Sequence, residues 1–384
     1  MPAHLRADLF GCRKWHWPKD MSLYYPEKKS SGVIVLLIAA VSMLACSPDS
    51  GYQSIQGSTM GTYYRVQYKS TPQCQVSQAS IDKLLVDFNL SLSTYLPNSE
   101  ITLFNNRLDE KFYPVSARFS NVLMAANMVW EQSGGAFDVT VGPLVNLWGF
   151  GPQETAAFPS VESQVKAFEA VGMQYLELRR ARAGGQTRGL DSVSGENFGA
   201  YSVSKKVPNL YLDFSALAKG LGVDEIAHSV KQTGCADFMV DIGGEVRTLG
   251  FSPKARPWRI GIEAPDATRR GMIQRVLELS GHSVATSGDY RNFREVDGVR
   301  VDHVIDPRTG KPADNTVVSV SVVHEDAMWA DAYATTFMVL GAEEGIRAAE
   351  NLNLAVLVIT KTSDDRFVER YTPAMTSFFV DFPE

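Results

Sequence analysis

Residues 212–220 read LDFSALAKG, in which a short apolar segment meets a helix-forming one at Ser215. Leu210 to Phe214 has the length and apolar character of a strand, and a helix is expected from Ser215 onward. Such a junction directs backbone N–H groups outward at the start of the helix, where they can bind a phosphate. Asp213 and Lys219 would place a carboxylate and an ammonium group beside it. A capped turn with a lysine that reaches solvent explains the same residues, so both interpretations stay open.

Short strands and amphipathic helices alternate along the rest of the chain. Apolar residues with helical spacing predict helices over Ser80 to Leu92 and Phe119 to Trp130, and further helices are expected from about Glu325 and from Ala342. Arg179 to Lys206, crowded with Gly, Ser and Arg, is expected to be a surface hairpin or insertion. The pattern favours mixed sheets layered with helices, in an α/β or α+β fold. The other predicted strands are Thr62 to Tyr68, Phe238 to Ile242, Trp258 to Glu263, Val317 to Val323 and Ala355 to Thr360.

The N-terminal segment, residues 1–46, is interpreted as a targeting leader. Its apolar run, Gly32 to Ala45, has about 14 residues and is too short to span a membrane as a helix. Cys46 follows directly, which is the layout of a bacterial lipoprotein signal with Cys46 as the lipidated residue; an ordinary signal peptide with an incidental cysteine is the alternative. Residues 1–20 do not resemble the n-region of a signal peptide, whereas Met21 would start a signal of ordinary length, so translation is expected to begin at Met21.

The folded domain is expected over residues 56–384, as one large domain or two closely packed subdomains, with a polar tether over residues 47–55. The leader carries about three positive charges in excess, so about −9 remains on the rest of the chain. This balance argues against a nucleic-acid partner, because phosphate backbones are bound by basic surfaces. Cys74 and Cys235 can pair in an oxidising compartment, but no disulfide is predicted because sequence does not give their separation in space.

Oxygen donors are spaced for a metal site near the C-terminus. Asp331 and Thr335 are four residues apart in the helix expected from Glu325, so they project from one face. A carboxylate and a hydroxyl suit Mg²⁺, and a third oxygen would strengthen the case. An Asp near a helix N-terminus and a Thr bonded back to its own helix explain the same pair without a metal.

Two further segments have residue types suited to ligand binding. Gly134 to Pro143, followed by Leu147 to Gly151, is dense in glycine and aromatic residues, which allow close approach to a flat ligand and stacking on it. Alternatively, this loop fills its own core. Asp306 to Thr309 predicts a type I turn, and His303 with Asp306 would place an imidazole and a carboxylate at one rim, where a group that handles a proton or a phosphate is expected. A simple hairpin rim explains the turn as well. The sequence has no GxGxxG motif after a strand and no P-loop, HExxH or CxxC motif.

Several short motifs, in their residues and in their order along the chain, together resemble those of the ApbE family of FAD:protein FMN transferases. The resemblance covers nearly the whole chain after the leader. These motifs are Thr59 to Thr62, Leu92 to Tyr95 with Ser99 to Ile101, Gly135 to Asp138, Leu212 to Gly220, Asp241 to Gly244, Ser287 to Tyr290, His303 to Gly310 and Asp331 to Thr335.

The resemblance implies an α+β, T-fold-related architecture and a Mg²⁺ ion held by the backbone carbonyl of Ala216 and the side chains of Asp331 and Thr335. Asp331 and His303 would serve catalysis. The same resemblance implies a set of residues along bound FAD: Met60, Tyr95, Ala136, Phe137, Asp138, Asp213, Lys219 and His303.

The activity that the resemblance implies is Mg²⁺-dependent transfer of FMN from FAD to a Thr or Ser hydroxyl of an acceptor protein, with release of AMP. The expected acceptors are exported subunits of membrane redox complexes, and the expected location is the periplasmic side of the inner membrane, through a lipid anchor. An FAD pyrophosphatase that gives FMN and AMP, or a non-enzymatic flavin-binding lipoprotein, are the alternatives.

Overall fold

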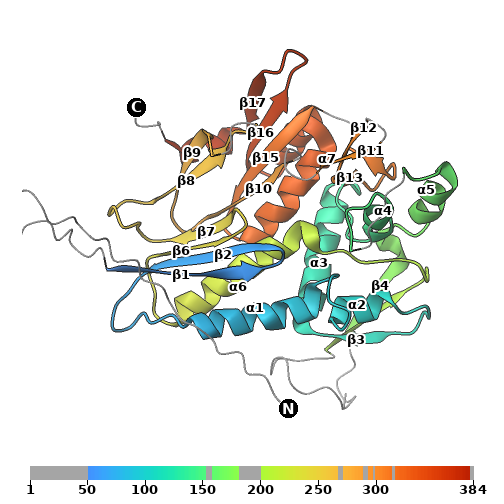
Figure 1. The fold of residues 1–384 in the computed structure, drawn as a ribbon, viewed down its shortest axis with the longest axis horizontal. Helices are drawn as coiled ribbons and strands as arrows, with labels where there is room; N and C mark the ends of the chain where they lie inside the picture. The colour runs from blue at the N-terminus through green and yellow to red at the C-terminus, as the bar shows by residue number, and fades with distance from the viewer. Residues whose placement is uncertain are drawn as a thin grey trace, which may run out of the picture. The chain divides into compact units, whose positions relative to one another are not determined.

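An eight-stranded sheet is the centre of the computed structural model, which describes residues 51–152, 158–180, 200–266, 271–288, 293–296, 299–313 and 316–380 (Figure 1). Its strands are ordered β1-β2-β6-β7-β10-β15-β16-β17, and all its paired neighbours are antiparallel. Their bounds are β1 (Tyr52–Thr59), β2 (Thr62–Lys69), β6 (Phe238–Ile242), β7 (Glu245–Leu249), β10 (Ser283–Gly288), β15 (Val317–His324), β16 (Ala355–Lys361) and β17 (Phe367–Tyr371).

Three long helices cover one face of this sheet: α1 (Gln78–Leu92), α6 (Ser215–Gln232) and α7 (Ala327–Asn351). Side chains alternate between the faces of a strand, so Tyr64 and Val66 of β2 point to the helices and are fully buried against α1 and α6. Gly341 interrupts α7 with φ 80° and ψ 176°, which confirms the separate helices expected from Glu325 and Ala342.

A second, three-stranded sheet packs on the other face, in the order β18-β9-β8 (Figure 1). Its strands are β8 (Trp258–Glu263), β9 (Ile273–Leu279) and β18 (Phe379–Val380). Ile262 of β8 and Leu277 of β9 are buried against Val246 of β7 and Leu357 of β16. β8 is therefore an outer strand of a small sheet that is anchored on the main one.

The remaining elements extend the helical layer. A sheet of order β3-β5-β4 and the helices α2 and α3 contribute to the largest core cluster, together with Phe214 and Phe337. Their bounds, with those of the other short elements, are α2 (Glu100–Asn105), α3 (Ala117–Gln132), α4 (Gly142–Leu147), α5 (Val161–Phe168), β3 (Tyr113–Val115), β4 (Leu176–Arg180), β5 (Tyr201–Lys205), β11 (Phe293–Val296), β12 (Val299–Asp302), β13 (Ile305–Asp306), β14 (Lys311–Pro312) and the 3₁₀ helices η1 (Met173–Tyr175) and η2 (Pro373–Phe378).

The α+β class is confirmed. The structure also confirms the helices predicted near Ser80, Phe119 and Ser215, and five of the six predicted strands. The strand predicted over Leu210 to Phe214 is wrong: only Tyr211 forms a bridge, to Val141. The side-chain amide of Asn105 pairs with both backbone groups of Leu212, at 2.8 and 2.9 Å, so these groups do not enter a ladder.

The start of the folded body lies ahead of Gln56, since Tyr52 already pairs with Lys69 in β1 and β2. The tether over residues 47–55 is therefore wrong from Tyr52 onward. The ends of Arg179 to Lys206 pair as β4 and β5, which confirms a hairpin there, while residues 181–199 lie outside the described residues.

A disulfide that was not predicted joins Cys74 to Cys235, with a Cα–Cα distance of 4.7 Å. It links the segment before α1 to the segment after α6, and both cysteines are buried. The sequence could not indicate this pair because the two residues come together only when α1 and α6 pack on the sheet.

The predicted leader, Cys46 and the start at Met21 lie outside the described residues. Ser50–Glu384 forms one compact unit. In the part of the chain that the structure describes, no helix combines the length and apolar character needed to cross a bilayer.

Candidate active site

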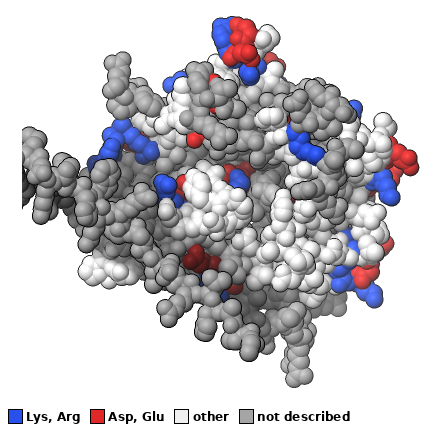
Figure 2. All heavy atoms as spheres, viewed as in Figure 1, with Lys and Arg blue, Asp and Glu red and all other residues white. Residues whose placement is uncertain are grey.

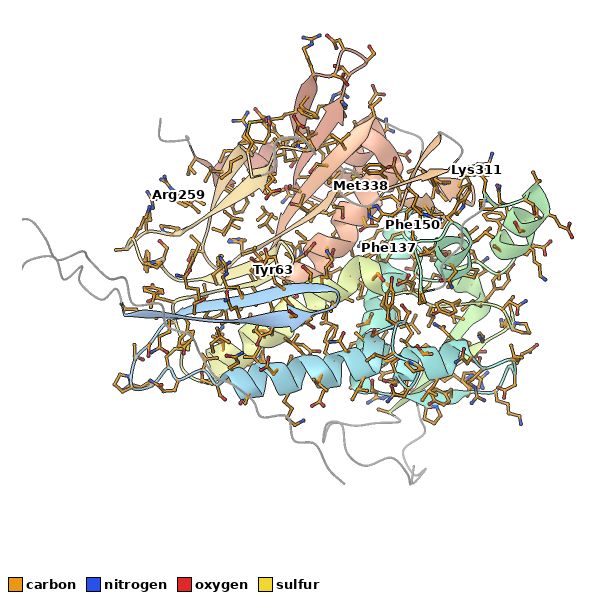
Figure 3. The ribbon with its side chains drawn as sticks, viewed as in Figure 1. Tyr63, Phe137, Phe150, Arg259, Lys311 and Met338 are labelled. Atoms are coloured by element: carbon orange, nitrogen blue, oxygen red, sulfur yellow. A yellow bond between two sulfur atoms is a disulfide. The ribbon has the colours of Figure 1, made fainter. Side chains whose placement is uncertain are left out.

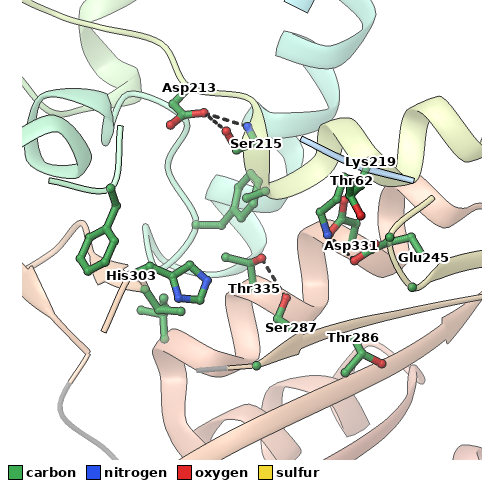
Figure 4. A pocket seen from close by; sticks show the side chains of 18 of the residues that line it. Thr62, Asp213, Ser215, Lys219, Glu245, Thr286, Ser287, His303, Asp331 and Thr335 are labelled. Carbon is green, nitrogen blue, oxygen red and sulfur yellow. Dashed lines mark hydrogen bonds and ion pairs between the residues drawn. The ribbon is translucent and has the colours of Figure 1, made fainter. Parts of the chain in front are cut away.

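A cavity of about 1010 Å³ opens where the main sheet divides between β7 and β10. β10 pairs with β7 only at Ser283 and Val284. The rest of β10, from Thr286 to Gly288, has no partner in β7 and lines the cavity. Figure 4 shows the cavity from close by. Ten predicted site residues line it: Tyr95, Ala136, Phe137, Asp138, Asp213, Ala216, Lys219, His303, Asp331 and Thr335.

The three predicted metal ligands come from two helices that pack on each other. Asp331 and Thr335 lie one turn apart on α7, and Ala216 lies in the first turn of α6. One Asp331 oxygen accepts the Gly220 N–H at 3.0 Å. Because the N–H of a helical residue points toward the carbonyl four residues earlier, this bond directs the Asp331 carboxylate toward the Ala216 carbonyl. The three groups therefore face one cavity.

Asp331 and Glu245 are buried and form a group of charges with Lys219, whose side chain is 35% exposed (Figure 4). The Lys219 ammonium bonds to Glu245 and lies 4.0 Å from Asp331. Burial raises the pKa of Glu245 to about 7, against the attraction of Lys219, and burial also raises the pKa of Asp331. Burial alone would lower the pKa of Lys219, but attraction by Asp331 and Glu245 raises it, so the lysine stays charged.

This charge group fits a bound cation. Two carboxylates share one ammonium, which leaves one negative charge in excess when both are ionised. One Glu245 oxygen is buried and has no hydrogen-bond partner among the described residues. Buried charge is costly unless it is paired, and Mg²⁺ commonly takes one or two carboxylates and completes its shell with phosphates and water. No cluster of three or more His, Cys, Asp or Glu suited to a metal occurs in the described ranges.

Thr335 is held in place by the strand beneath it. Its hydroxyl lies 3.2 Å from that of Ser287 on β10. The hydroxyl of the preceding residue, Thr286, is hydrogen-bonded to the hydroxyl of Ser321 on β15. The two β10 side chains thus point to opposite faces of the sheet. In Figure 4, Thr335 lies between His303 on one side and the Lys219, Glu245 and Asp331 group on the other.

Asp213 organises the start of α6. Its carboxylate accepts the Ser215 N–H at 2.9 Å and also the Ser215 hydroxyl. Its own N–H donates to the Val139 carbonyl at 2.8 Å, which ties this turn to the glycine-rich loop. The expected helix start at Ser215 is confirmed, and both Ser215 and Ala216 line the cavity.

Asp138 is a structural anchor as well as a lining residue. One oxygen accepts the Thr140 N–H at 2.7 Å and its hydroxyl at 2.6 Å, and the other accepts the Met173 N–H at 3.2 Å. Burial raises the pKa of this carboxyl, against these bonds. Asp138 therefore shapes the loop that presents Ala136 and Phe137 to the cavity.

His303 and Asp306 prove to have different surroundings. His303 lines the cavity, with its ring 6.2 Å from that of Phe150. Asp306 does not line it, and its carboxylate accepts the backbone N–H of Arg308 and two bonds from the Arg308 guanidinium, at 2.9 to 3.0 Å. The expectation that both titratable groups serve one rim is wrong, because Asp306 caps its own turn.

Met60 is the one predicted FAD residue that does not line the cavity. It occupies the two-residue turn between β1 and β2 with φ 49°, and Gly61 follows with φ 72°. Its side chain packs into the core beside Gly222 of α6. The structure therefore gives Met60 a packing role, since the turn directs its side chain under α6.

The match with a known family rests on residues 60–358, which fit the model of the ApbE family. The chain belongs to the ApbE family. An FAD:protein FMN transferase from Vibrio cholerae is 38% identical over 349 residues, 90% of this chain and 98% of the relative. The Escherichia coli K12 relative of the same name is 34% identical and covers 90% of this chain and 97% of its own length.

Solved ApbE structures have the same fold. Flavin transferase ApbE from Vibrio cholerae superposes with a TM-score of 0.74 at 38% identity, covering 85% of this chain and 99% of that one. The flavinyl transferase ApbE from Pseudomonas stutzeri gives 0.72 at 32% identity, covering 85% and 96%.

Three lining groups of this ApbE member were not predicted from its sequence. Glu245 directly follows the Asp241 to Gly244 motif and was given no role, yet it bonds to Lys219. Tyr63 donates to Asp241 at 3.1 Å on the other side of that turn, and both line the cavity. Only the alternation of β2 and β6 side chains would have placed these two on one face. The continuation of the Ser287 motif, residues 289–292, lies outside the described residues.

Proposed function

We propose that this protein is an Mg²⁺-dependent enzyme that transfers the FMN part of FAD to a Thr or Ser hydroxyl of an acceptor protein and releases AMP. The observation that supports it most is the single cavity that brings together seven of the eight predicted FAD residues and all three predicted metal ligands. Relatives that share 32% to 38% identity over about 90% of this chain have the name FAD:protein FMN transferase.

The buried charges suit a diphosphate and its cation. Asp331, Thr335 and the Ala216 carbonyl would hold Mg²⁺, which would supply positive charge to the phosphate oxygens. Lys219, kept charged by its two carboxylates, would stabilise the same oxygens, together with the N–H groups at the start of α6. Tyr95, whose side chain is exposed, would offer an aromatic face to the isoalloxazine ring, and Phe137, which is buried in the core, also lines the cavity.

His303 is proposed to orient the phosphate or to relay the proton of the acceptor hydroxyl. Its support is its place on the cavity wall, across Thr335 from the charge group (Figure 4). An imidazole can take up and release a proton near neutrality, as either task requires.

We further propose that the protein is a lipoprotein anchored through Cys46 on the periplasmic side of the inner membrane, with acceptors among exported subunits of membrane redox complexes. The leader pattern supports export. The Cys74–Cys235 disulfide supports it too, because such bonds persist in oxidising compartments.

The test is to mix the protein from Ser47 onward with FAD, Mg²⁺ and a candidate acceptor domain, and to look for flavin fluorescence on the denatured acceptor. The proposal expects a fluorescent acceptor and one AMP for each flavin attached, and neither without Mg²⁺. Free FMN and AMP with no labelled acceptor would indicate an FAD pyrophosphatase. FAD that stays whole with the metal present would indicate a flavin-binding protein without activity.

A further inference from the structure

The cavity has a second wall that none of the proposed FAD or metal residues occupies. The residues assigned to FAD and Mg²⁺ all lie around α6, α7 and the loops beside them. Beyond the β6–β7 turn the cavity continues over the opposite face of the main sheet. Its lining there comes from β2, β6, β7 and β8 and includes Tyr63, Met239, Asp241, Val246 and the run Arg259 to Glu263.

The two ends of the cavity are separate in space. Figure 3 shows Arg259 on one side of the molecule and Phe137 and Phe150 on the other, with Tyr63 between them in this view. Tyr63 and Asp241 lie on the sheet face opposite α6, because Tyr64 and Ile242, their neighbours in sequence, are buried among the helices. The β6–β7 turn thus marks the boundary between an α6–α7 wall and a β8 wall.

β8 presents its edge to the cavity. Five consecutive residues, Arg259 to Glu263, line it. Successive side chains of a strand point to opposite faces, so neighbours can all reach one cavity only where the strand lies edge-on to it. β8 is the outer strand of its sheet, and the described residues pair it with β9 alone. An antiparallel strand paired on one side directs the N–H and C=O groups of alternate residues to the other side.

We propose, on the basis of the transferase function above, that the acceptor polypeptide binds along β8 as an added antiparallel or parallel strand, which brings its hydroxyl-bearing residue to the β6–β7 turn. The acceptor is a protein, so an extended backbone must reach the cavity, and an open strand edge recognises a backbone through main-chain hydrogen bonds. Arg259, at the start of the run, is exposed and adds a positive charge beside this edge, although it also pairs with Glu278 at 3.0 Å.

Gly261 in the middle of β8 does not itself indicate a ligand. A Cβ there would lie 2.8 Å from the Ile273 side chain, so packing already requires a glycine. The inference depends on the strand edge and on its place in the cavity wall.

The first experiment is hydrogen–deuterium exchange of the protein with and without a synthetic peptide that reproduces the acceptor segment used in the transfer assay, in the absence of FAD. We expect slower exchange at alternate amides of Arg259 to Glu263. Unchanged exchange in β8 with slower exchange elsewhere on the protein would overturn the inference.

The second experiment uses a peptide series in which one backbone amide at a time is N-methylated. Loss of a main-chain hydrogen bond should raise the KM for the peptide about three- to tenfold, at every second position. An equal effect at all positions, or no effect at any, would contradict strand addition.

Arg259→Ala and Glu278→Ala form a matched pair, because each removes the same 3.0 Å ion pair and only Arg259 lines the cavity. We expect Arg259→Ala to raise the KM for the acceptor with the KM for FAD unchanged, and Glu278→Ala to change neither. A higher KM for FAD in Arg259→Ala would assign this wall to the nucleotide and overturn the inference. The two proposals fail separately: β8 protection without flavin transfer would refute the proposed function, and transfer without β8 protection would refute only strand addition.

Discussion

The two walls of the cavity differ in how their polar groups are satisfied. On the α6–α7 wall, Asp331 and Glu245 are 2% and 1% exposed and are bonded to Gly220 and Lys219. On the β8 wall, Arg259 and Gly261 are exposed, and the strand edge continues along the cavity. Fixed, buried charges are suited to stabilising a transition state without reorganisation, whereas an open strand edge is suited to a partner that comes and goes.

Figure 2 shows Lys and Arg interspersed with Asp and Glu over the described surface of one face. The contrast between the two walls concerns residues that line the cavity, and variants of each wall can test it.

The largest effect is expected for Asp331→Asn, which keeps an oxygen for the Gly220 N–H and removes the charge. We expect transfer to fall by more than about a hundredfold while the melting temperature changes little, because the proposed function makes this residue a metal ligand rather than a packing residue. Transfer rates over a Mg²⁺ titration, with thermal unfolding alongside, measure both. An active Asp331→Asn protein, or one that fails to fold, would remove the metal from the α6–α7 wall.

His303→Ala and Asp306→Ala compare a residue that lines the cavity with a nearby residue that does not. We expect His303→Ala to lower transfer by about 10²-fold with FAD still bound, on the scale of a lost proton-transfer group. Asp306→Ala should cost about 1–3 kcal/mol of unfolding free energy, because the bonds to Arg308 are lost, and leave the transfer rate unchanged. FAD titration by flavin fluorescence accompanies both assays. Full activity in His303→Ala would end its proposed role.

Asp224→Ala tests what holds the α6–α7 wall together. Asp224 on α6 accepts the N–H groups of Ala327 and Met328 at the start of α7, both at 2.9 Å, and pairs with Arg247. We expect its loss to cost about 1–3 kcal/mol and to raise the Mg²⁺ concentration needed for half-maximal transfer. Glu225→Ala is the control, since Glu225 pairs with Arg118 on α3. An equal change in Mg²⁺ dependence in both variants would deny Asp224 this role.

A smaller effect is expected on the pH dependence of stability. The Glu245 pKa, about 7 in the folded protein against an ordinary 4.5, means that the folded state binds the proton more tightly than the unfolded state. Stability of the metal-free protein should therefore fall as pH rises from about 4.5 to about 7, and Glu245→Gln should reduce this dependence. Melting temperatures at pH 5 and pH 7 measure it. If the wild-type protein instead gains stability between pH 5 and pH 7, and gains more than Glu245→Gln, the raised pKa of Glu245 would be contradicted.

Much of the α6–α7 wall could be predicted because its residues follow local rules. The four-residue spacing of Asp331 and Thr335 places both on one helix face, and the helix start at Ser215 follows from the sequence around it. Family resemblance added Ala216 as a third oxygen donor, and the cavity contains all three.

The errors occur where tertiary contacts decide. The Asn105 side chain bonds to the Leu212 backbone groups that a strand would have paired with a neighbouring strand. The Arg308 guanidinium bonds to the Asp306 carboxylate. Glu245 reaches Lys219 only because β7 packs on α6. The β8 wall could not be predicted, since the sequence identified a strand over Trp258 to Glu263 without showing which edge would stay open or what it would face.

Anomalous scattering from a crystal grown with FAD and Mn²⁺ in place of Mg²⁺ tests the central claim most directly. We predict a peak bounded by the Asp331 carboxylate, the Thr335 hydroxyl, the Ala216 carbonyl and the FAD diphosphate. A peak elsewhere in the cavity, or FAD bound with its diphosphate away from α6 and α7, would contradict the account.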